Sequence, residues 1–65
     1  MEYKVISGDC ELKVNKRNPR DAAIHAIRIW NYKLSKPNLT KITTVIDSKK
    51  QEVHLLTSKL IEEIS

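Results

Sequence analysis

Apolar and polar side chains alternate along the first fifteen residues, and the alternation is interrupted once, at residues 8–9. A period of two is typical of strands that bury one face. Glycine at the first of the two central positions favours a type II′ hairpin turn. A hairpin closed there places Val5 opposite Leu12 and Tyr3 opposite Val14, so all four side chains share one face. The pattern therefore predicts a β-hairpin over the first fifteen residues.

The spacing then changes to that of an amphipathic helix. Asn18 can cap the first free amides, Pro19 suits the first helical position, and Asp21 is placed for a shortened capping box. We expect the helix over residues 20–34, ended by Pro37, which disfavours helical backbone at the residue before it. Its apolar stripe consists of Ala23, Ala26, Ile27, Trp30 and Leu34, flanked by Ala22, Ile29 and Ile24.

Two further strands are predicted, over residues 39–47 and 52–56, joined by a polar turn. A two- or four-residue loop sets Ile42 opposite Leu55 and Thr44 opposite Val53. These four side chains would then share the face that meets the helix. In this register Ile42, Thr44 and Ile46 point inward, and Thr43 and Val45 point outward.

The last residues admit two interpretations. Thr57 or Ser58 can cap a short helix over residues 59–64, whose Leu60, Ile61 and Ile64 would face the body of the protein. The alternative is a longer fourth strand that continues through Leu60. With the helix, the order is β-β-α-β-β-α.

This order predicts a single α+β domain over residues 1–65. Its sheet has four strands and is mainly antiparallel, with the main helix packed on one face. If the helix crosses that face, strands two and three run parallel to each other and flank strand one. The expected strand order is therefore 2-1-3-4.

A helix layer on one side leaves the other side of the sheet open to solvent. We expect apolar side chains there among charged ones, available to a protein partner or to a second copy of the chain. Scattered exposed aliphatic side chains are also ordinary on protein surfaces. The candidate interface residues are Ile6, Val45, His54 and Leu56.

Twelve Lys and Arg residues against eight Asp and Glu give a net charge of +4. Four of these cations surround the predicted start of the helix, where free amides add a second element that attracts anions. Sequence-tolerant nucleic-acid binding is the function this cluster suggests, although it contains no aromatic side chain to stack on a base. The alternative is an ordinary solvated basic surface. The cluster consists of Lys13, Lys16, Arg17 and Arg20.

Catalytic and metal-binding patterns do not emerge from the sequence. Cys10 is the only cysteine, so no internal disulfide forms, and its inward position favours a packing role. His25 and His54 have no companion at metal-ligand spacing. Adjacent Glu62 and Glu63 point about 100° apart on a helix and do not converge on one substrate atom. We therefore expect no enzyme activity, cofactor, metal or small-molecule substrate.

The same features indicate a location. A small domain without disulfides is typical of a reducing cytoplasm, and no apolar run approaches the ~20 residues that span a bilayer. No signal peptide is evident at the start of the sequence. We expect a cytoplasmic protein that does not enter a membrane.

The segment 14–23, Val-Asn-Lys-Arg-Asn-Pro-Arg-Asp-Ala-Ala, resembles the entry into the helix of small β-β-α domains. The chain as a whole, short and rich in Lys, Ile and Asn, resembles small proteins of unassigned function encoded by tailed bacteriophages. This resemblance implies an accessory role in the host cytoplasm, and it implies no catalytic residue.

Overall fold

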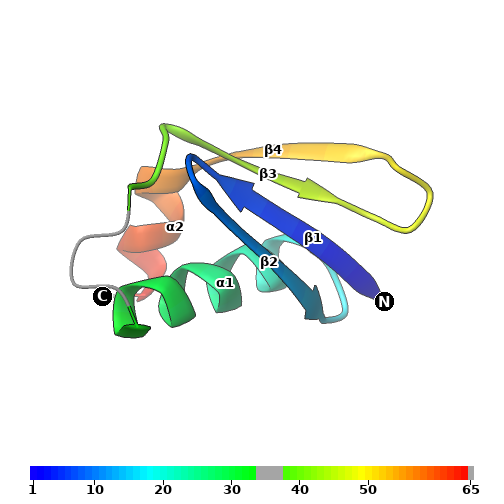
Figure 1. The fold of residues 1–65 in the computed structure, drawn as a ribbon, viewed down its shortest axis with the longest axis horizontal. Helices are drawn as coiled ribbons and strands as arrows, with labels where there is room; N and C mark the ends of the chain where they lie inside the picture. The colour runs from blue at the N-terminus through cyan, green and yellow to red at the C-terminus, as the bar shows by residue number, and fades with distance from the viewer. Residues whose placement is uncertain (34–37, 65) are drawn as a thin grey trace.

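The computed structural model describes residues 1–33 and 38–64, and within them the six elements follow the predicted order (Figure 1). The four strands form one sheet in the order β2-β1-β3-β4, and each neighbouring pair is antiparallel. The α+β class and the strand order are thereby confirmed. Leu34 and the predicted helix end near Pro37 lie outside the described residues. The elements are β1 (Glu2–Ser7), β2 (Cys10–Asn15), α1 (Pro19–Lys33), β3 (Ile42–Ile46), β4 (Glu52–Leu56) and α2 (Thr57–Ile64).

The first hairpin has the predicted register. Val5 lies opposite Leu12 and Tyr3 opposite Val14. Gly8 has a φ of +59°, as a type II′ turn requires at its first central position. Cys10 is buried on the same face of the sheet, which agrees with a packing role.

The second hairpin is shifted by one residue from the predicted register, so that prediction is wrong. Val45 lies opposite Val53, and Ile42 lies opposite Leu56. The loop is the cause: the Asp47 N–H donates to the carbonyl of Gln51 (3.1 Å), which leaves three residues, 48–50, in the turn. A three-residue loop changes the pairing by one relative to a loop of two or four residues.

This shift reverses the two faces of β3. Val45 is only 1% exposed and lies on the helix side, opposite Val5 of β1, so its predicted outward position is wrong. Thr43 is buried beside it, whereas Ile42 is 40% exposed on the other face. The predicted orientation is wrong because residues 42 and 46, which point outward, are both isoleucine. The residues that point inward include Thr43, whose buried hydroxyl is hydrogen-bonded to Thr57.

Both helices cover the same face of the sheet (Figure 1). Helix α1 contacts β1, β2 and β3, and its small side chains allow a close approach to the strands. Helix α2 contacts α1 and β4. Of its predicted inward residues, Leu60 is buried and Ile64 is half-buried, but Ile61 is 41% exposed. The predicted α1 stripe is confirmed at Ala23, Ala26, Ile27 and Trp30, and Ala22 at its flank is buried as well.

Helix α2 begins directly where β4 ends. Thr57 is buried, and its N–H donates to the carbonyl of Lys41 (2.9 Å). Its hydroxyl donates to the carbonyl of Thr40 (2.7 Å). These bonds hold the chain at the turn into the helix. The alternative of a strand that continues through Leu60 is therefore wrong, and the predicted closing helix is confirmed with a start two residues earlier.

Candidate interaction surfaces

The sheet face opposite the helices, called here the open face, carries a band of apolar side chains. Pairing places Ile6 opposite Thr44 and diagonal to both isoleucines of β3, at a spacing that long side chains bridge. Leu56 lies opposite Ile42 and is 52% exposed. The band, called the apolar patch below, consists of Ile6, Ile42, Ile46 and Leu56.

Charged and polar side chains surround the apolar patch. The Lys4 ammonium lies 2.7 Å from the Glu11 carboxylate. His54 Nδ1 lies 3.1 Å from the hydroxyl of Thr44, and its Nε2 lies 3.6 Å from the Glu52 carboxylate. All of these side chains except Thr44 are exposed. The patch therefore has a polar rim that contains both signs of charge.

Three of the four candidate interface residues, Ile6, His54 and Leu56, lie on the open face, and Val45 lies in the core. Ile42 and Ile46 belong to the patch, whereas the predicted register directs them inward. One residue in the sequence favours the three-residue turn that the structure shows. Asp47 opens the turn, and its carboxylate accepts hydrogen bonds from the amides of Lys49 (2.8 Å) and Gln51 (2.9 Å). Aspartate at such a position favours a turn of this kind.

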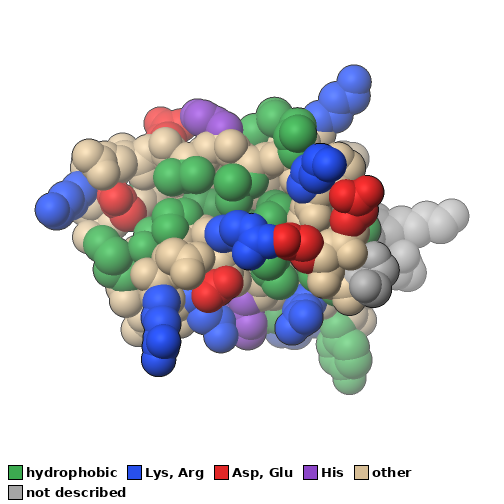
Figure 2. Space-filling view, turned by 180° about the vertical axis from the view of Figure 1, so that it is seen from behind, with side chains coloured by type: hydrophobic (Ala, Val, Ile, Leu, Met, Phe, Trp, Pro, Cys, Tyr) green, Lys and Arg blue, Asp and Glu red, His purple; other side chains and the backbone are tan. Residues whose placement is uncertain are grey.

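The predicted basic cluster does not converge on one point. Lys13 lies on the open face opposite Lys4. Arg20 forms an ion pair with Glu63 of α2. Lys16 and Arg17 remain together and line one hollow of about 500 Å³. Lys16 also lines a neighbouring hollow with His25 and Arg28. Figure 2 shows Lys and Arg side chains along the lower side of the molecule, where α1 lies.

The helix start within this basic region is capped by its own side chains. The N–H of Asp21 donates to Asn18 Oδ1 (2.8 Å), which confirms the cap. The Asn18 amide in turn donates to the Asp21 carboxylate (3.3 Å), so the reciprocal bond runs between side chains instead of to the backbone. Asp21 also lines both hollows. Its negative charge weakens the attraction of this corner for an anion.

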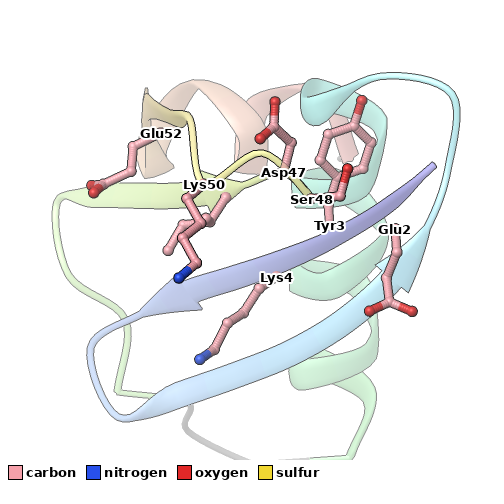
Figure 3. Close-up of a pocket in the computed structure, with 8 residues that line it drawn as sticks. Glu2, Tyr3, Lys4, Asp47, Ser48, Lys50 and Glu52 are labelled. Atoms are coloured by element: carbon pink, nitrogen blue, oxygen red, sulfur yellow. The ribbon is translucent and has the colours of Figure 1, made fainter.

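A further hollow of about 410 Å³ lies between the start of β1 and the loop that joins β3 to β4 (Figure 3). Glu2 and Glu52 stand on opposite sides of it and point away from each other, so they form no acid–base pair. Lys4 and Lys50 point in the same direction. Like charges do not stabilise each other, and this hollow presents no converging catalytic set.

The remaining chemical candidates have structural partners. Glu63 pairs with Arg20, and Glu62 lies 3.9 Å from Lys59, one helical turn away. In the part of the chain that the structure describes, no three His, Cys, Asp or Glu side chains gather as metal ligands. Nor is any described helix both long and apolar enough to cross a bilayer.

Comparisons with protein-family models, with curated proteins and with solved structures found no match to this chain. Interpretation of its function therefore depends on the surfaces described above. Of these, the open face presents the exposed apolar side chains of the patch, and the corner at Lys16 and Arg17 presents positive charge.

Proposed function

We propose that the protein is a non-catalytic binding module that engages another protein surface through its open face. The observation that carries the proposal is the apolar patch in the middle of a sheet face that neither helix covers. Ile42 and Leu56 lie side by side there, and both are strongly exposed. Contiguous exposed apolar groups with a polar rim are typical of protein interaction sites.

The surroundings of the patch suit a protein partner. An apolar centre supplies binding free energy through burial, and mixed charges at the rim set the orientation of the partner. The acidic side chains Glu11 and Glu52 at this rim would repel a phosphate backbone. An accessory role in a cytoplasm accompanies this proposal, in line with the lone cysteine and the resemblance to small phage proteins.

The test compares two lysine variants in an affinity capture from the native host. Ile42→Lys places a charge in the apolar patch, and Tyr32→Lys places the same charge on α1, where Tyr32 is already 90% exposed. We expect proteins held by the native chain to be lost with Ile42→Lys and kept with Tyr32→Lys. Equal capture by all three chains would contradict the proposal, as would no capture by any of them.

A second candidate function is sequence-tolerant nucleic-acid binding at the α1 corner. The observation that favours it is the pair of adjoining hollows that share Lys16, with Arg17 in one and Arg28 in the other. Cations spaced along a surface neutralise successive phosphates, and such binding weakens steeply with salt. Titration with DNA and with RNA at two salt concentrations tests it. Failure to bind at low salt would exclude this function.

A further inference from the structure

Strand β4 is the edge of the sheet that is least protected. Among the strands that the structure describes, β4 pairs with β3 alone. Along Glu52–Leu56 four of five residues are exposed and Leu55 is half-buried, so side chains on both faces of the strand meet solvent. Val53, on the helix side, is 36% exposed because α1 covers the other three strands. An open edge with apolar neighbours is a template for another strand.

The opposite edge differs. Strand β2 buries Cys10 and Val14 under α1 and carries Glu11 and Lys13 on its open face. Lysine on an edge strand is a common protection against pairing with another chain. Strand β4 contains neither lysine nor proline. Of the two edges, β4 is therefore the one suited to accept a strand.

We propose that the edge of β4 pairs in antiparallel fashion with β4 of a second copy of this chain. This inference rests on the proposed function, because the pairing sets two open faces side by side in one eight-stranded sheet. The register that we assign places Val53 opposite Val53 of the second copy. Glu52 of each copy then lies opposite His54 of the other.

Complementarity between the Glu52 carboxylate and the His54 imidazole selects the second copy as the occupant. In this register a carboxylate faces an imidazole at two symmetric positions, and the central pair is apolar. Within one chain His54 Nε2 already lies 3.6 Å from the Glu52 carboxylate, so both side chains are on the same face and near the edge. An imidazole N–H can donate a hydrogen bond to a carboxylate that faces it directly across antiparallel strands, and such cross-strand pairs stabilise pairing.

The hydrogen-bonding phase of β4 agrees with this register. The Asp47 N–H donates to the carbonyl of Gln51, which makes this a hydrogen-bonded pair of the hairpin. Alternation along an antiparallel ladder then directs the backbone groups of Val53 toward β3. Those of Glu52 and His54 point to the open edge. Glu52 and His54 are therefore the residues that exchange backbone hydrogen bonds with the second copy. Val53 lies at the non-hydrogen-bonded position between them.

Sedimentation velocity of the purified chain over a range of concentrations tests this pairing. We expect a concentration-dependent dimer, because a short edge gives a small and weak interface. His54→Glu places glutamate opposite Glu52, and we expect it to weaken dimerisation at least about tenfold. Adding Glu52→Lys to that variant places lysine opposite glutamate at both positions and should restore the dimer. Circular dichroism verifies that each variant is folded.

The possible outcomes separate this inference from the proposed function. A strict monomer at all concentrations overturns the pairing and leaves the capture test of the open face unaffected. A dimer that Ile42→Lys disrupts and His54→Glu does not overturns the pairing too, and it places the second copy against the open face. A dimer that responds only to the charge changes supports the pairing, whatever the capture test shows.

Discussion

Two residues with positive φ, Gly8 and Lys50, shape the two hairpin turns. Position 8 requires glycine, because a Cβ atom there would clash with the carbonyl oxygen of Asn38. Lys50 adopts a φ of 65° with a side chain present. A left-handed backbone conformation at a residue other than glycine costs roughly 1–2 kcal/mol.

Lys50→Gly should therefore stabilise the protein. Glycine relieves the left-handed conformation but adds freedom to the unfolded chain, so we expect a net gain of about 0.5–1 kcal/mol in the free energy of unfolding. Urea unfolding followed by circular dichroism measures it. Lys49→Gly removes the same charge one residue earlier, where φ is not positive, and should give no gain. Equal effects of the two changes would contradict the interpretation of strain at Lys50.

At the scale of the elements, a buried chain of hydroxyl groups joins β3 to the start of α2. The Thr57 hydroxyl donates its proton to the carbonyl of Thr40 (2.7 Å). The Thr43 hydroxyl, 2.7 Å away, must then donate to Thr57. The Thr57 hydroxyl thus bonds two groups, the buried Thr43 hydroxyl and the carbonyl of Thr40, and both bonds are lost if its oxygen is removed.

Thr57→Val should consequently be more destabilising than Thr43→Val. The two changes have the same chemistry, and both sites are buried. Removal of Thr57 Oγ1 leaves the buried Thr43 hydroxyl without its partner, at about 1–3 kcal/mol, and also removes the bond to the carbonyl of Thr40. Removal of Thr43 Oγ1 leaves the bond from Thr57 to Thr40 intact. Thermal unfolding of the two variants measures the difference, and an equal loss would refute this donor assignment.

At the scale of the whole molecule, the charge is unevenly distributed. The described strands place Glu2, Lys4, Glu11, Lys13 and Glu52 on the open face, a mixture of three acids and two bases. The chain nevertheless carries a net charge of +4, so the excess of positive charge lies elsewhere. A partner that meets the open face is therefore not selected by strong positive charge.

Nucleic-acid binding at the α1 corner predicts a different effect for charges removed there and for charges removed elsewhere. If the α1 corner binds a phosphate backbone, Lys16→Ala combined with Arg17→Ala should weaken binding and reduce the salt slope by about two phosphate contacts. Lys41→Ala with Lys49→Ala removes the same charge away from those hollows and serves as the matched control. The measurement is binding of DNA or RNA against salt concentration. Equal losses in both double variants would show an effect of net charge alone.

Local signals predicted much of this fold and less of its surface. The cap at Asn18 and the turn at Gly8 act over a few residues, so both could be read directly from neighbouring positions. The register of β3 and β4 depended on the length of one loop, and an error of one residue there moved Val45 between the core and the open face. Such an error also changes the candidate surfaces. Side chains alternate between the two faces of a strand, so a shift of one residue moves each of them to the other face.

The amino-acid sequence by itself determined the order of the elements, the helix cap, the first hairpin and the antiparallel sheet. These follow from periodicity and turn chemistry, which are properties of short segments. Only the tertiary structure decided which face of β3 is buried, because Ile42 and Val45 are both apolar and packing against α1 chooses between them. It also decided that Arg20 pairs with Glu63, a contact between residues far apart in the chain.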